Sequence, residues 1–362
     1  MTIYIIYLVL IGIQSLFFYR NGKLRKENFN IKDFLILCCM ELIFIAGLRG
    51  YNIGADTEVY LRTIDYYGKM SVSELLRADI VYPFDFEIGY FLLTKLCCLI
   101  GFGKTTFLFV VAIITYIPVF KLIKQHSSNA YLSILCYFAF GFFTYSLGLF
   151  RQMIAVSIVL CGLNYVVERK LVKYLVIIGI AMTFHTTALV GILLYILYGV
   201  KWQRIISWVI PVEFGLLFFG RYIVLLLTRI FPQYAGYVGG KYDVQGGSYL
   251  MLFFLNLVFI ASILFRHREE NKSENIMMCA LILAICLQCL GYSMGIFGRL
   301  VSYYSIYIII AIPNFIYNAG ETLEKGGRGV MTLLTILCLL TLTILSFSGD
   351  NYVVPYYTFW RQ

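Results

Sequence analysis

Four cationic or potentially cationic side chains lie at the outer ends of predicted helices. Arg49 opens the stretch RGYNIGADTEVY, Arg151 lies in GLFRQMIA, His185 in TFHTTA and Arg299 in GIFGRLVSYY. An isolated charge costs about 2.5–3.5 kcal/mol at the centre of a membrane helix, so grouping these residues around water or an anion offsets that cost. Because a guanidinium matches phosphate in a bidentate fork, we predict that the four converge on one outward-opening pocket for a pyrophosphate.

Each of these residues also has a simpler interpretation. An arginine at a helix end often serves only as an anchor whose charge reaches the membrane surface, and we interpret Arg221 and Arg229 in this way. A lone histidine in an apolar helix is often a hydrogen-bonded packing residue. The sequence contains no Walker loop, GxSxG, DxD or paired-carboxylate motif, and its cysteines lie mostly in apolar runs rather than at zinc spacing. We therefore expect neither a metal nor a cofactor.

The composition indicates that lipid surrounds the elements that carry these residues. The 362 residues are 61% hydrophobic and 13% charged, with a mean hydropathy of +0.84, whereas a soluble domain carries about a quarter charged residues. The net charge of +10 is spread over short loops, which favours membrane orientation over nucleic-acid binding. We predict a single polytopic membrane domain over residues 1–362.

Twelve apolar runs are long enough to be candidate membrane helices, and backbone groups in lipid must be paired within their own segment. The fold class is therefore predicted to be all-α, with about 12 transmembrane helices. The runs cover about 3–19, 33–48, 105–120, 130–147, 151–167, 171–185, 187–200, 205–227, 249–265, 276–295, 300–318 and 330–347.

The positive-inside rule orients these helices. Six short loops hold more than half of the 29 basic residues, and we predict that they are cytoplasmic, so that both termini lie outside. These basic positions are Arg20 to Lys32, Lys121 and Lys124, Arg169 to Lys173, Lys201 and Arg204, Arg266 to Lys272, and Lys325 and Arg328. A full crossing by the short segment 88–100, which has Lys95 at its centre, would invert every later loop. We therefore interpret this segment as re-entrant or interfacial.

Two predicted outer loops, 49–87 and 228–248, are longer than ordinary connections, and loops of this length are usually functional or disordered. Both place aromatic residues beside charged ones. Aromatic faces suit the apolar side of a sugar ring, and carboxylates and arginines suit its hydroxyls. We predict that these loops contact a glycan.

The same motifs resemble the EpsG family, the Wzy-like polymerases of bacterial exopolysaccharide and capsule assembly. Individually short and partly apolar, they occur in the family's order over roughly residues 1–320, and the last thirty or so residues contribute little. The matching pieces are LRGYNIGADTEVY (48–60), FEIGYFLL (86–93), FRQMIAVSIVL (150–160), AMTFHTTAL (181–189) and FGRLVSYY (297–304).

The resemblance implies a membrane glycosyltransferase of GT-C-like architecture in the bacterial cytoplasmic membrane. It would join oligosaccharide repeat units carried on undecaprenyl pyrophosphate at the outer face, with a chain-length regulator and a flippase as possible partners and no nucleic acid. Arg151 and Arg299 would stabilise the departing pyrophosphate, with Arg49 as a third contributor.

The general base for the acceptor hydroxyl would be His185 or Asp56, and His185 could equally be a phosphate ligand. The other expected substrate-binding residues are Tyr60, Glu87, Tyr303 and Tyr304. Two other classes remain open. A lipid-linked oligosaccharide flippase should show a repeat between its halves, and a membrane O-acyltransferase should open His185 to an acyl donor.

Overall fold

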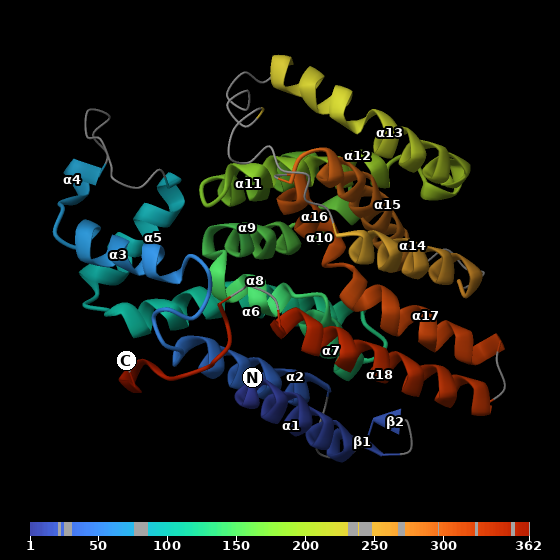
Figure 1. Cartoon of the computed structure of the whole chain (residues 1–362), viewed down its shortest axis with the longest axis horizontal. Helices are drawn as coiled ribbons and strands as arrows, with labels where there is room; N and C mark the ends of the chain where they lie inside the picture. Colours follow the sequence, from blue (N-terminus) through green and yellow to red (C-terminus); the bar gives the residue numbers. More distant parts are fainter. Residues whose placement is uncertain are drawn as a thin grey trace. The chain divides into compact units, whose positions relative to one another are not determined.

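The computed structural model describes residues 1–20, 23–24, 31–75, 86–230, 238, 248–266, 272–295, 297–322, 325–348 and 352–361. In these residues the regular structure is helical, apart from two paired antiparallel strands of two residues each, β1 (Tyr19–Arg20) and β2 (Lys23–Leu24). The expected all-α class is therefore confirmed (Figure 1).

The chain divides into two compact units. The first contains Met1–Gly162, Val176–Leu189 and Leu333–Gln362, and the second contains Leu163–Leu175 and Val190–Thr332. The expectation of a single polytopic membrane domain stays a prediction.

The first unit carries most of the predicted chemistry. Its helices are α1 (Thr2–Phe18), α2 (Ile31–Gly47), α3 (Thr57–Tyr67), α4 (Val72–Leu75), α5 (Ile88–Leu99), α6 (Lys104–His126), α7 (Ala130–Ala139), α8 (Phe142–Gly148), α9 (Phe150–Cys161) and η4 (Phe359–Arg361). It also holds the end of α11 (Leu171–Met182), the start of η1 (Thr186–Gly191) and most of α18 (Lys325–Ser348).

An aromatic core joins the short helices of this unit to the long ones. Helix α6 packs against α2 and α9, and α3 packs against α5. The buried rings of Tyr60 in α3 and Phe150 in α9 stack with their centroids 4.7 Å apart, and Tyr90 of α5 lies 5.4 Å from Tyr60. Because aromatic pairs of this kind favour defined geometries, the core fixes α3 and α5 beside the first turn of α9.

The second unit is built around α15, which packs against α13, α14 and α16. Its helices are α10 (Leu163–Val167), α12 (Ile192–Tyr198), η2 (Trp202–Arg204), α13 (Ile206–Ile230), α14 (Tyr249–Leu264), α15 (Lys272–Ser293), α16 (Phe297–Ser305) and α17 (Ile308–Thr322), together with the start of α11 and the end of η1.

The apolar helices support a multi-pass membrane protein. Within the described residues, four helices are long and apolar enough to cross a membrane, or up to six spans if each of two bent helix pairs forms one. The four are Lys104–His126, Ile206–Ile230, Glu274–Ser293 and Gly326–Ser348, and the pairs are α7 with α8, bent by 58°, and α16 with α17, bent by 41°. Each predicted apolar run coincides with one helix or two successive short ones, but twelve crossings and a GT-C-like architecture stay predictions.

The short segment 88–100, which has Lys95 at its centre, forms helix α5. Its 12 residues extend about 18 Å, well short of the roughly 30 Å of a hydrocarbon core. Lys95 is buried, and its ammonium donates to the carbonyls of Gly68 (3.1 Å), Tyr67 (3.4 Å) and Met70 at the end of α3. The charge therefore caps a neighbouring helix, and the re-entrant or interfacial interpretation of the segment stays a prediction.

The two predicted outer loops differ in how much of them the structure describes. The first contains α3 and α4, while its residues 76–85 lie outside the described residues. Of the second, residues 231–237 and 239–247 lie outside them. The predicted glycan contact of the second loop therefore stays a prediction.

Candidate functional site

Arg49 holds together the loop that leads from α2 to α3. Its side chain is 1% exposed. The guanidinium donates to the carbonyls of Leu147 (3.1 Å), Ile53 (3.3 Å) and Ala46, and it lies 5.2 Å from the centroid of the Phe150 ring. These neutral acceptors use its nitrogens, and the Leu147 and Ile53 carbonyls share the Thr57 hydroxyl as a further donor. The structure thus gives Arg49 a role in loop architecture.

The same loop fits closely against the end of α8. The Leu147 carbonyl also accepts a hydrogen bond from the Thr57 hydroxyl at 2.8 Å. Gly54 has φ +102°, and a Cβ there would lie 2.1 Å from the Leu147 oxygen. Only glycine fits this backbone position without strain. The GADT part of the motif is therefore a packing signature that places α3 against α9.

A C-terminal segment, residues 352–359, forms backbone hydrogen bonds with this loop. The backbone N–H of Gly50 donates to the Tyr357 carbonyl at 2.8 Å, that of Gly54 donates to the Tyr352 carbonyl at 2.9 Å, and the Phe359 N–H donates to the Leu48 carbonyl at 3.1 Å. The family resemblance covers roughly residues 1–320, so little was expected of these last residues. They nevertheless supply hydrogen bonds that hold the Arg49 loop.

Glu87 joins two of the predicted catalytic residues. It precedes the first turn of α5 with an extended backbone. One carboxylate oxygen forms an ion pair with the Arg151 guanidinium, and the other lies 2.9 Å from Nδ1 of His185 and accepts the Thr186 backbone N–H at 3.1 Å. Partners that are 64 and 98 residues from Glu87 in sequence thus meet at one carboxylate.

A close backbone approach holds Glu87 at this position. The N–H of Gly89, in the first turn of α5, donates to the Thr183 carbonyl at the end of α11 at 2.7 Å. A Cβ at Gly89 would lie 2.3 Å from the Thr183 hydroxyl oxygen and 2.7 Å from its carbonyl oxygen. Any larger residue would therefore push α5 away from His185, which explains the glycine in FEIGYF.

Aromatic rings flank the charged cluster formed by Glu87, Arg151 and His185. The Arg151 guanidinium lies 4.1 Å from the ring centroid of Phe86 and 5.9 Å from that of Tyr60, within the range of cation–π attraction. The side chains of the cluster are only 13–18% exposed. Tyr60, an expected substrate-binding residue, is itself 4% exposed, and its ring helps position the guanidinium.

The electrostatics of the cluster favour an ionised Glu87. Partial burial by itself raises the pKa of the carboxyl, but the hydrogen bond with His185 and the charge of Arg151 outweigh it, so the pKa lies below its usual value. An ionised carboxylate only accepts hydrogen bonds. Nδ1 of His185 therefore carries a proton, and in the neutral ring Nε2 is left as the basic nitrogen.

Two nitrogens of the cluster have unused hydrogen-bonding capacity. Nε of Arg151 and Nε2 of His185 are buried, and neither has a hydrogen-bond partner among the described residues. The first is a donor, and in the neutral ring the second is an acceptor.

Three of the remaining predicted site residues belong to the second unit, and one precedes α3 in the first. Arg299 lies on an exposed position of α16 in the second unit, so its convergence with Arg151 stays a prediction. Tyr303 and Tyr304 are each 1% exposed, and the Tyr304 hydroxyl donates to the Val190 carbonyl. Asp56 precedes α3 and makes no side-chain capping hydrogen bond there.

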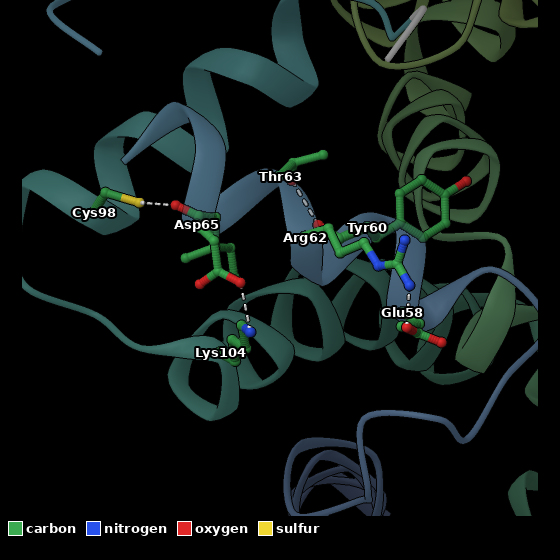
Figure 2. A network of polar contacts seen from close by, with 8 residues as sticks. Glu58, Tyr60, Arg62, Thr63, Asp65, Cys98 and Lys104 are labelled. Carbon is green, nitrogen blue, oxygen red and sulfur yellow. Dashed lines mark hydrogen bonds and ion pairs between the residues drawn. The ribbon is translucent and has the colours of Figure 1, made fainter. Parts of the chain in front are cut away.

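The outer face of α3 carries a second set of charges (Figure 2). Arg62 pairs with Glu58 at 2.5 Å, with side chains 65% and 58% exposed, and Lys104 pairs with Asp65 at 2.7 Å. Both pairs are open to water, unlike the Arg151 pair. In the described part of the chain, no group of three or more His, Cys, Asp or Glu residues could hold a metal, and metal independence stays a prediction.

Comparison with known proteins gives one match. The model of the EpsG family matches residues 32–358, whereas no curated protein and no solved structure matches the chain. The match extends beyond residue 320, the limit suggested by the motifs, and it includes most of the C-terminal segment that closes the Arg49 loop. Because the match covers nearly the whole chain, this protein is a member of the EpsG family.

Proposed function

We propose that this protein is a membrane glycosyltransferase that joins oligosaccharide repeat units carried on undecaprenyl pyrophosphate at the outer face of the bacterial cytoplasmic membrane. Membership of the EpsG family supports a role in polysaccharide synthesis. The apolar helices are consistent with a lipid-linked substrate. The specific reaction is our inference from the charged cluster.

The observation that carries the proposal is the pair of unsatisfied nitrogens on either side of Glu87. A buried donor without a partner costs about 1–3 kcal/mol, so Nε of Arg151 is expected to bind an acceptor in the working enzyme. A phosphate oxygen of the donor substrate has the charge and geometry that a guanidinium prefers.

In the proposed reaction, a sugar hydroxyl of the incoming unit attacks the anomeric carbon of the growing chain. The bond from that carbon to the pyrophosphate oxygen breaks, and undecaprenyl pyrophosphate leaves with the electron pair. The proton of the attacking hydroxyl passes to Nε2 of His185. Arg151 stabilises the charge that develops on the leaving group, and Glu87 orients both residues.

The structure leads us to refine the expected roles. We assign the base to His185 rather than Asp56, because Glu87 orients the imidazole and leaves Nε2 unpartnered within the described residues. Arg49 supports the loop, since its guanidinium is used by backbone carbonyls. Arg299 remains the proposed second cation for the pyrophosphate, and a flippase and a chain-length regulator remain proposed partners.

The experiment that tests this proposal uses the purified full-length protein and an undecaprenyl-pyrophosphate oligosaccharide. We expect the wild type to lengthen the glycan in a ladder, and Glu87→Gln, Arg151→Lys and His185→Gln to lose most of that activity. Arg62→Lys is the matched control, since it changes an arginine that is also paired with a glutamate but is exposed.

Two results would contradict the proposal. If wild-type protein in sealed vesicles moves the substrate across the bilayer without lengthening it, the protein is a flippase. If it instead transfers an acyl group to the glycan, His185 serves an O-acyltransferase.

A further inference from the structure

Helix α5 exposes an aliphatic stripe that begins beside the charged cluster. Ile88, Leu92, Leu96, Leu99 and Ile100 are between 41% and 64% exposed. Their spacing of three or four residues places them on one face of the helix. Glu87, which holds Arg151 and His185, is the residue immediately before this stripe.

The rest of α5 is fixed to the first unit. Tyr90 and Thr94 lie on the face opposite the stripe and are each 0% exposed. Lys95 lies beside the stripe, three residues after Leu92, but it is 7% exposed and its ammonium donates to the carbonyls of Tyr67 and Gly68 at the end of α3. The Gly89 N–H donates to the Thr183 carbonyl. These contacts set the orientation of the helix that presents the stripe.

We propose that this stripe binds the polyprenyl chain of a lipid-linked pyrophosphate whose head group lies at Arg151 and His185. The inference rests on the proposed function and identifies where its substrate's lipid tail lies. A charged site continuous with an aliphatic stripe matches an amphiphile that has an anionic head and a long branched hydrocarbon tail. Burial of such a tail is favourable in proportion to the apolar area that is covered.

A second stripe in the protein provides a matched control. On α14, Leu250, Phe253, Leu257 and Leu264 are between 48% and 70% exposed at similar spacing. The residue before this helix is Ser248, whose side chain caps it. Among the described residues that adjoin its first turn, this stripe has no arginine–glutamate–histidine cluster, so it serves as the reference for contact with ordinary membrane lipid.

The direct test is photo-crosslinking of the full-length protein in nanodiscs. The probes are undecaprenyl pyrophosphate and undecaprenol, each with a diazirine on the isoprenoid chain, and a diazirine-bearing phosphatidylcholine. Mass spectrometry then locates the adducts. We expect the pyrophosphate probe to label α5 several-fold more than α14, and the other two probes to label both helices alike. Equal labelling of both helices by the pyrophosphate probe, or no labelling of α5, would overturn the proposal.

A binding measurement supplies the second test. We expect Leu92→Ala with Leu96→Ala to raise the Kd for undecaprenyl pyrophosphate about tenfold and to leave the Kd for geranyl pyrophosphate unchanged. Leu250→Ala with Leu257→Ala should change neither. An equal loss for both ligands would mean that the α5 change damages the head-group site rather than tail binding.

Neither photo-crosslinking nor the Kd measurement requires glycan lengthening. The polyprenyl site on α5 and the polymerase function can therefore be refuted independently. If α5 is labelled as expected but the wild type lengthens no glycan, the polymerase assignment is wrong and the lipid site stands. If glycan is lengthened but labelling follows bulk lipid, the lipid site is wrong and the polymerase assignment stands.

Discussion

Two arginine–glutamate pairs in the first unit have the same chemistry in different surroundings. Arg62 and Glu58 lie one turn apart on the outer face of α3 and are more than half exposed (Figure 2). Arg151 lies in α9 and Glu87 immediately precedes α5, their side chains are 18% and 16% exposed, and the Glu87 carboxylate also contacts His185. An exposed pair is screened by water and contributes little, whereas a partly buried pair interacts more strongly and is costly to break.

The difference shows how partner choice determines the role of an arginine. In the exposed pair, water can accept hydrogen bonds from the Arg62 nitrogens that do not bond to the Glu58 carboxylate. In the buried cluster, Nε of Arg151 has no partner among the described residues, and we propose that a ligand oxygen accepts this hydrogen bond. Arg49 is a third case, because backbone carbonyls use its donors and leave it suited to support the fold.

The largest expected effect comes from Arg151→Lys. Lysine keeps the charge but loses the planar fork, and removing one donor from a preorganised site costs about 2.7–4 kcal/mol, or roughly 10²–10³ in rate. We expect glycan lengthening to fall by that factor in a purified assay corrected for protein amount. Arg62→Lys should leave the rate within about twofold. Near-normal polymer from Arg151→Lys would mean that Arg151 is only a membrane anchor.

Replacing Arg49 should affect stability more than chemistry. Arg49→Met leaves three buried carbonyls with one donor fewer each, at a cost on the order of 3 kcal/mol. We expect a lower yield and a lower Tm in detergent, but a rate per folded molecule within a few-fold of wild type. If Arg49→Met is instead stable but inactive, Arg49 acts in substrate binding rather than in supporting the loop.

Glu87→Gln tests the bridging carboxylate, with an expected stability cost of about 1–3 kcal/mol and a matching loss of activity. Because the pKa of Glu87 is lower in the folded protein, its contribution is fully present above the unfolded pKa of about 4.3. It is lost as the pH falls through the folded pKa. The difference in Tm between wild type and variant should therefore be constant near neutral pH and shrink below about pH 4.

The smallest expected effect is at the exposed pair. Glu58→Gln should change the free energy of unfolding by about 0.3–0.5 kcal/mol and leave glycan lengthening unchanged, with added salt removing the difference. A large loss of activity from this variant would show that the outer face of α3 contacts substrate.

The sequence predicted where helices form better than it predicted which charges meet. Every predicted apolar run contains helix because hydrophobic runs are local signals, and the 88–100 segment was singled out by its length and by Lys95. Arg151, His185 and Glu87 were all expected to act at the site, but their shared carboxylate depends on contacts across 64 and 98 residues, which no local pattern encodes.

Other parts of the site were beyond the reach of sequence patterns. Arg49 and Arg151 both lie at an end of a predicted apolar run, so the sequence gives no reason to expect that one is buried against carbonyls. Gly89 had a readable signal, since a glycine within the first turn of a short helix often permits a close backbone approach. No sequence pattern predicts that the C-terminal segment contacts the Arg49 loop, because backbone groups make these hydrogen bonds and any residue type supplies them.

The hydrogen bonds between this segment and the Arg49 loop also set an order of assembly. The Tyr356 hydroxyl bonds to the Ile45 carbonyl, 311 positions earlier in the chain. At a synthesis rate of roughly 5–20 residues per second, the loop would wait on the order of 15–60 s for its partner. The loop after α2 is therefore among the last parts of this unit to be completed, and a ribosome stalled before residue 352 would leave it without these hydrogen bonds.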